Sequence, residues 1–219
     1  MKIVAIRDPH RDDSRLATGE RGLPEVAAAG CAAAETEAMR ADGAAMEAVA
    51  RGDLEALGQL YDRHAPALER TLAMWGVAAC DVNDLVQAIF LEILRAAPRF
   101  DRARSARAWL FGVAHIMTRR HRRSLARAVV RVARWRATTI DRVAPPPSEA
   151  YEGREAGRRI ESAFARLSRK KRDVLVLVTV EGLTGQEAAR ALGIPLKTVW
   201  TRLHHARLEL REALGEEVP

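Results

Sequence analysis

The stretch that most constrains the fold is TGQEAARALGIPLKTVWTRLHHARLE, residues 184–209, because it predicts two helices joined by a tight turn. Thr184 can cap the free backbone donors of the first helix. Gly193 allows the left-handed conformation that ends this helix, and Pro195 suits the first position of the next one. Apolar residues then recur at steps of four, three and four, which predicts one buried stripe: Val199, Leu203, Ala206 and Leu210.

The opposite face of the second predicted helix is basic and rich in hydrogen-bonding side chains. In a helix-turn-helix, the N-terminal part of the second helix enters the major groove of DNA, where Arg and Lys donate to guanine and Thr and His contact base edges or phosphates. The pattern therefore predicts DNA binding, with an ordinary helical hairpin that has a solvated basic face as the alternative. The side chains on or beside this face are Lys197, Thr198, Trp200, Thr201, Arg202, His204, His205 and Arg207.

The positive charge of the chain is concentrated in one segment. The formal net charge is +7 over 219 residues, but residues 102–140 contain eleven Arg and no Asp or Glu. This segment carries +11, so the remainder of the chain carries −4 (+7 less +11). A local excess of this size indicates a polyanionic partner.

Composition narrows the class of protein further. Aromatic residues make up only 5%, and Ala, Leu and Arg dominate, which favours helix over sheet. Cys31 and Cys80 match no metal-ligand spacing and suggest no disulfide framework, so we expect a reducing, cytoplasmic environment. No apolar stretch approaches the ~20 residues of a membrane span, and the apolar run at the N-terminus is too short for a signal peptide. We therefore expect no membrane insertion.

The order of patterns predicts an all-α fold of two small helical domains joined by a proline-containing linker. Residues 1–43 are expected to be a weakly structured extension, residues 44–124 the first domain, residues 125–153 a basic and proline-containing linker, and residues 154–215 the second domain. Inside the first domain, helical spacing breaks at Gly52-Asp53, and a separate helical segment is expected from about residue 65 to 75.

Residues 174–180 are β-branched and alternate enough that propensity alone favours a strand. Because they lead directly into the helix-turn-helix pattern, and because of the family resemblance given below, we expect a helix here. Ser168 is the expected cap of that helix.

Residues 81–94 form the clearest amphipathic helix of the chain. One broad apolar stripe is formed by Leu85, Val86, Ile89, Phe90, Ile93 and Leu94. The other side is expected to face solvent, yet it includes an apolar residue, Leu91, which would suit a partner surface. That side carries Asp84, Gln87, Ala88, Leu91 and Glu92.

The basic segment begins as an amphipathic helix capped by Ser105. Trp109 belongs to its apolar side and is expected in the core. Several cations then crowd within a few turns, where they repel one another unless a polyanion neutralises them. Phosphate contact is the simplest explanation, and a solvated charge run is the alternative. These cationic residues are Arg107, Arg119, Arg120, His121, Arg122 and Arg123.

Two separated segments together resemble one family. DVNDLVQAIFLEIL (residues 81–94) followed by RAWLFGVAH (residues 107–115) resembles region 2 of the extracytoplasmic-function (ECF) sigma factors of bacterial RNA polymerase. LSRKKRDVLVLVTVEGLTGQEAARALGIPLKTVWTRLHHARLEL (residues 167–210) resembles region 4 of these factors. The order, the spacing and the proline linker between them also match.

The resemblance implies a function in transcription initiation. It implies binding to core RNA polymerase, at the beta-prime clamp and the beta flap, and to promoter DNA, commonly with an anti-sigma factor as a further partner. It assigns clamp binding to Asp84, Gln87, Ala88, Leu91 and Glu92, and −35 binding to the basic face of residues 197–207 given above. The −10 element is assigned to Arg107, Trp109, His115, Thr118, Arg119, Arg120, Arg122 and Arg123.

Some positions depart from the family pattern. The family usually has Asn at His115, Asp at Arg119, Arg at Trp200 and a larger aliphatic residue at Ala188. A stand-alone helix-turn-helix regulator is the alternative function. We expect no enzyme, cofactor or metal, because the six histidines form no ligand set with nearby carboxylates and no nucleophile or phosphate-loop motif is present.

Overall fold

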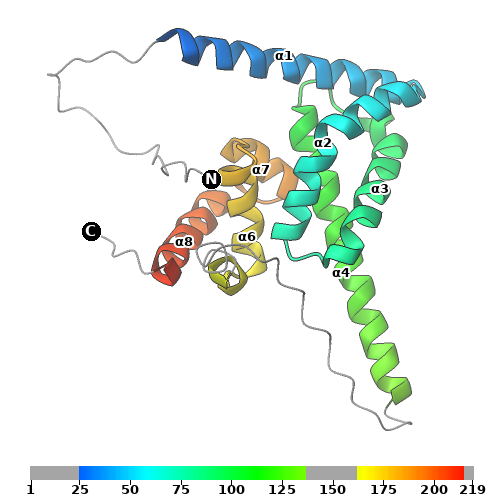
Figure 1. The fold of residues 1–219 in the computed structure, drawn as a ribbon, viewed down its shortest axis with the longest axis vertical. Helices are drawn as coiled ribbons and strands as arrows, with labels where there is room; N and C mark the ends of the chain where they lie inside the picture. Colours follow the sequence, from blue (N-terminus) through cyan, green and yellow to red (C-terminus); the bar gives the residue numbers. More distant parts are fainter. Residues whose placement is uncertain (1–24, 137–161, 215–219) are drawn as a thin grey trace, which may run out of the picture. The chain divides into compact units, whose positions relative to one another are not determined.

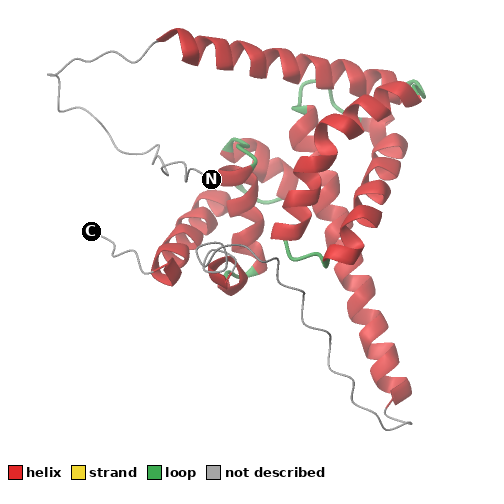
Figure 2. Ribbon diagram, in the orientation of Figure 1, coloured by secondary structure: helices red, strands yellow, loops and turns green. Residues whose placement is uncertain are grey.

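The computed structural model describes residues 25–136 and 162–214, and these residues contain helices and no strand (Figures 1 and 2). The order is α1 (Glu25–Ala50), α2 (Leu54–Met74), α3 (Ala79–Ala96), the short 3-10 helix η1 (Ala97–Arg99) and α4 (Ala106–Arg136). After helical residues 162–166 follow α6 (Arg169–Leu175), the π-helix η2 (Val176–Val180), α7 (Gly185–Leu192) and α8 (Leu196–Leu214). The described residues from 38 onward belong to one unit, and every contact given below lies within it. The all-α prediction is confirmed.

Helices α2, α3 and α4 form an N-terminal bundle together with the last turns of α1. Asp53 begins α2, because its carboxylate accepts hydrogen bonds from the amides of Glu55 and Ala56 at 2.9 and 3.1 Å. Gly76 follows α2 with a φ of 84°, a conformation that glycine adopts at little cost. The largest side chains of this core are Met46, Leu60, Leu68, Leu72, Trp75, Ile89, Ile93, Leu110 and Phe111.

The predicted helix-turn-helix lies in the C-terminal group of helices within this unit (α6, η2, α7 and α8), which we call the C-terminal domain. Thr184 and Glu187 form a capping box at the start of α7, in which each side chain bonds the other residue's backbone amide. Gly193 ends α7 with a φ of 64°. Val199, Leu203 and Ala206 of α8 are buried as the stripe predicts, whereas Leu210 is half-buried.

Residues 174–180 are helical, as expected, although their composition favours a strand. Val174 to Leu177 are all buried, so packing on every side outweighs the small helix-propensity cost of β-branched residues. Ser168 is the N-cap residue of α6, but its side chain makes no capping hydrogen bond.

Three boundaries differ from the prediction. Residues 25–43, expected to be weakly structured, belong to α1, because their alanine-rich sequence has high helix propensity. Helix α2 continues through Pro66 rather than restarting near residue 65, since Leu60 and Leu68 anchor both halves in the same core. Helix α4 extends to Arg136, past the predicted linker start at 125. The prolines of the linker lie outside the described residues.

None of the helices in the described part of the chain is long and apolar enough to cross a membrane.

Candidate nucleic-acid interface

Helix α8 presents the predicted DNA-facing side chains at the surface. Five of the eight are exposed and three, Thr198, Arg202 and Arg207, are half-buried. The Thr201 hydroxyl donates to the Lys197 carbonyl at 3.0 Å, which holds it against its own helix. The exposed residues are Lys197, Trp200, Thr201, His204 and His205.

Trp200, one of the departures from the family pattern, packs on the start of α7. A Cβ atom added to Gly185 would lie 2.5 Å from Cζ2 of the Trp200 ring, closer than atoms can approach. Gly185 therefore leaves the space that the indole occupies. Trp200 joins the two helices of the helix-turn-helix as well as being partly exposed.

The predicted side chains on α4 divide into two groups. Arg119, Arg120 and Arg123 are exposed, and Arg120 lies 3.8 Å from a carboxylate oxygen of Glu92. The others are covered in part or in full: Arg107, Trp109, His115, Thr118 and Arg122.

Each covered residue of α4 has a partner inside the protein. The Thr118 hydroxyl donates to the Ala114 carbonyl at 2.8 Å, and Arg122 donates to the Trp75 carbonyl. The Trp109 ring meets Phe100 edge-on, with centroids 5.5 Å apart, in line with the expected core position.

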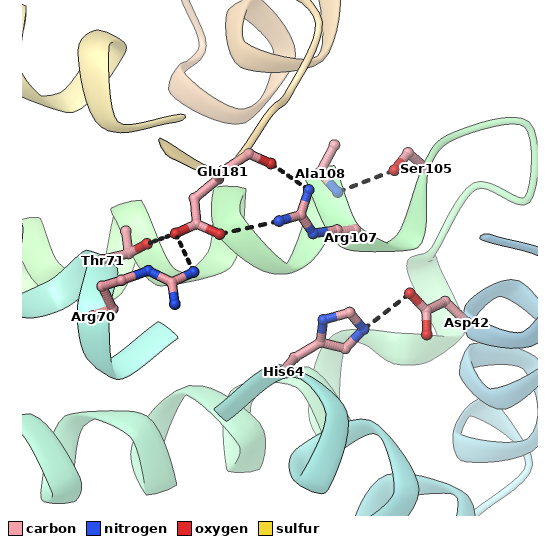
Figure 3. A network of polar contacts seen from close by, with 8 residues as sticks. All are labelled: Asp42, His64, Arg70, Thr71, Ser105, Arg107, Ala108 and Glu181. Carbon is pink, nitrogen blue, oxygen red and sulfur yellow. Dashed lines mark hydrogen bonds and ion pairs between the residues drawn. The ribbon is translucent and has the colours of Figure 1, made fainter. Parts of the chain in front are cut away.

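Arg107 takes part in a cluster that sequence reasoning missed. Glu181 follows η2, and its side chain is fully buried, with 0% exposed. Its carboxylate accepts hydrogen bonds from Thr71 at 2.9 Å, Arg70 at 3.1 Å and Arg107 at 3.0 Å, and its carbonyl accepts another from Arg107 (Figure 3). Thus a carboxylate of the C-terminal domain is bonded entirely by side chains of the N-terminal bundle. The only sequence signal was one acid at the end of an apolar run.

His115 also faces the C-terminal domain. Its Nδ1 atom lies 3.7 Å from an oxygen of Asp173 on α6, and its ring meets Trp75 edge-on. Burial, aided by the charges of Arg119 and Arg122, lowers the pKa of His115 to about 4. Burial raises the pKa of Asp173 to about 6, although nearby arginines oppose the shift. At neutral pH the imidazole is therefore uncharged and the carboxylate is largely ionised.

Helices α4 and α7 approach closely beside this pair. A Cβ atom on Gly112 would lie 3.3 Å from the Cα atom of Ala191, so the glycine permits near backbone contact. We call the contacts of Glu181, of His115 with Asp173, and of Gly112 with Ala191 the interdomain interface.

Helix α3 carries the third predicted surface. Its apolar stripe is buried except for Leu94, which is half-buried. On the other side, Asp84, Gln87 and Leu91 are exposed and Ala88 and Glu92 are half-buried. Leu91 is 55% exposed, so the face contains an apolar residue surrounded by acidic and amide groups. Within the described residues, no group of three His, Cys, Asp or Glu side chains could hold a metal ion.

Comparison with known proteins decides the family. Residues 60–136 match the model of sigma-70 region 2, and residues 157–210 match that of sigma-70 region 4. The sigma factor NccH of Alcaligenes xylosoxydans xylosoxydans is 30% identical over 175 residues, which cover 79% of this chain and 94% of NccH. The sigma factor CnrH of Cupriavidus metallidurans is 32% identical over 174 residues, covering 77% and 91%. The chain belongs to the ECF sigma factors of RNA polymerase.

This sigma factor also has the fold of a solved relative. The structure of CnrH in complex with the cytosolic domain of CnrY has a TM-score of 0.59, is 29% identical, and covers 81% of this chain and 99% of CnrH. Region 2 corresponds to α2, α3 and α4, and the region 4 match includes α6, η2, α7 and most of α8. As a sigma factor, the protein binds core RNA polymerase and directs it to promoters.

Proposed function

We propose that three faces divide the work of initiation: α3 binds core RNA polymerase, the basic side of α4 binds the −10 element, and α8 binds the −35 element. The protein acts in the cytoplasm and has no catalytic activity of its own. The observation that carries the proposal is the face of α3, where Leu91 is 55% exposed beside acidic and amide side chains in a segment that matches the model of sigma-70 region 2.

The DNA-binding part of the proposal is supported by charge and exposure. Arg119, Arg120 and Arg123 extend from α4 into solvent, where phosphates can reach them. On α8, Lys197 and Thr201 lie in its first turns, which is the part of a recognition helix that contacts bases. Because arginine contacts to phosphate release counterions, promoter binding should weaken steeply with salt.

A protein regulator is a further proposed partner. CnrH was solved with the cytosolic domain of CnrY bound to it, and the present chain matches nearly all of CnrH. We propose that an anti-sigma factor likewise binds this protein.

The test of the α3 face compares two exposed leucines. Leu91→Asp places a charge in the proposed polymerase surface, whereas Leu54→Asp places the same charge at the first turn of α2, where Leu54 is 65% exposed. We expect the Leu91 variant to lose co-elution with core polymerase and promoter-directed transcription, and the Leu54 variant to retain both. Circular dichroism checks that both variants fold. Normal polymerase binding by Leu91→Asp would overturn the proposal.

A further inference from the structure

A half-open cavity with a strongly basic lining lies beside the interdomain interface. The cavity has a volume of about 350 Å³, within the usual range of small-molecule sites. Helix α4 of region 2 forms one wall, and α6, the turn of the helix-turn-helix and α8 form the other. Its cationic side chains are Arg119, Arg122, Arg123, Arg169, Lys170 and Arg202.

The charges around this cavity are not balanced by the protein. Asp173 is the single carboxylate in the lining, against six cations. Within the described part of the chain, Arg122 alone among the six cationic side chains has a hydrogen-bond acceptor, the Trp75 carbonyl. Bringing region 4 against region 2 gathers like charges in one place, which opposes closure unless an anion occupies the space.

Asp173 gives the cavity a buried hydrogen-bond acceptor that has no donor. Its Oδ1 atom is buried and has no hydrogen-bond partner, while its other oxygen faces His115. A buried acceptor without a donor costs free energy, so this atom favours a ligand that brings a donor group into the cavity.

We propose that this cavity binds a small molecule with two or more linked phosphates, which bridges α4 to α6 and α8 and holds the two sigma regions together. Guanidinium and ammonium groups on opposite walls match the several negative charges of a phosphate chain. Arg169 and Lys170 belong to none of the proposed DNA-binding or polymerase-binding faces. The cavity therefore includes two cationic side chains that the proposed function does not explain. Two sources share this chemistry, inorganic polyphosphate and nucleoside polyphosphates.

Titration calorimetry on the full chain tests the proposal with inorganic tripolyphosphate as the probe. We expect saturable binding at one site. Replacing Arg169 and Lys170 together by Ala should weaken this binding by roughly tenfold or more, because two charge-assisted contacts are lost. The matched control replaces Arg166 and Arg190 by Ala, which removes the same charge from exposed positions outside the cavity. Equal weakening by the two double variants, or no saturable binding, would overturn the proposal.

The same titrations with ATP and GTP distinguish the sources. Tighter binding of a nucleotide than of tripolyphosphate, lost in Asp173→Ala, which removes the acceptor, identifies a nucleoside polyphosphate whose donor meets Asp173. Equal affinities identify the phosphate chain alone as the ligand. Dyes attached to Cys80 of region 2 and to Arg211→Cys of region 4, with Cys31→Ser, report how close the two regions lie. Tripolyphosphate should raise energy transfer between these dyes in the otherwise unchanged protein and not in the Arg169 and Lys170 double variant. Binding of duplex DNA without any binding of the small anions would assign the cavity to promoter phosphates and overturn the proposal.

Discussion

Helices α4 and α8 both have a basic face in sequence, but the face of α8 is mostly exposed, whereas part of the face of α4 is covered by region 4. On α8 the predicted DNA-binding residues are mostly exposed, whereas on α4 His115 and Thr118 are buried and Arg107 bonds Glu181 of region 4. The apolar stripe of α8 is used within its own domain, while the side of α4 that carries Arg107 and His115 packs against the other domain. A basic helix is available to DNA only where no other domain covers it. We therefore expect α4 to become fully accessible only when region 4 moves away.

Removing the Glu181 carboxylate should have the largest effect on how far region 4 covers α4. Glu181→Ala leaves Arg70, Thr71 and Arg107 without their shared acceptor, and breaking a buried ion pair in this way costs about 3–5 kcal/mol. Arg70 and Arg107 are partly exposed, so water limits the cost to the lower end of that range. We expect the two regions to separate while each stays folded.

Energy transfer between dyes measures this separation. One dye is attached to Cys80, which is exposed, and the other to Arg211→Cys, in a background with Cys31→Ser. Glu209→Ala is the control, because Glu209 pairs with Lys171 inside region 4. Unchanged transfer in Glu181→Ala would show that the carboxylate does not hold the regions together.

His115 and Asp173 should each make the free energy of unfolding depend on pH, in opposite directions that largely cancel in the wild type. The folded pKa of His115, about 4, lies below its ordinary value of 6.5, so its contribution to stability rises with pH between these values. The folded pKa of Asp173, about 6, lies above its ordinary value of 3.8, so its contribution falls over nearly the same interval. The two contributions, each about 1.4 kcal/mol per pKa unit, oppose one another.

Single substitutions should reveal each contribution. Asp173→Asn should make the free energy of unfolding rise between about pH 4 and 6.5, and His115→Gln should make it fall between about pH 4 and 6. Urea titrations at several pH values compare each variant with the wild type. Asp42 does not interfere: burial alone would raise its pKa, but His64 and Arg63 lower it, so it titrates at lower pH. Parallel pH profiles for both variants and the wild type would contradict the assignment.

A wedge between α4 and α7 should open the interface with a smaller effect. Gly112→Leu forces a side chain into the space next to Ala191, and overpacking of this kind typically costs about 1–3 kcal/mol. Gly58→Leu is the matched control, because nothing lies within 4 Å of a Cβ atom at that helical position. We expect lower energy transfer between the regions only in the Gly112 variant, and equal transfer in both would argue against close packing of α4 on α7.

The smallest expected effect is confined to region 4. Thr184→Ala removes the capping box of α7, which should cost about 1 kcal/mol of helix-turn-helix stability. Chemical denaturation measures the loss, and Thr179→Ala at an exposed position is the control. A comparable loss in the control would mean that the cap contributes little.

Features of this protein that depend on residues close together in the chain could be predicted from its sequence. Thr184 and Gly193 set the limits of α7, and the stripe of α3 identified the face that leaves Leu91 exposed. Helix capping, left-handed glycine and helical periodicity each involve residues only a few positions apart, so the sequence alone reveals them.

Which basic residues of α4 are covered, and by which groups, depends on contacts between residues far apart in the chain. Glu181 and Thr71 are 110 positions apart, and Glu181 and Arg107 are 74 apart, so no local pattern links them. Trp200 against Gly185 and His115 against Asp173 are likewise meetings of separate helices. The sequence does not show whether a polar side chain is hydrogen-bonded to water or to a carboxylate that is distant in the chain. Packing between helices makes that choice, because it alone sets which groups lose their water and must find a partner in the protein.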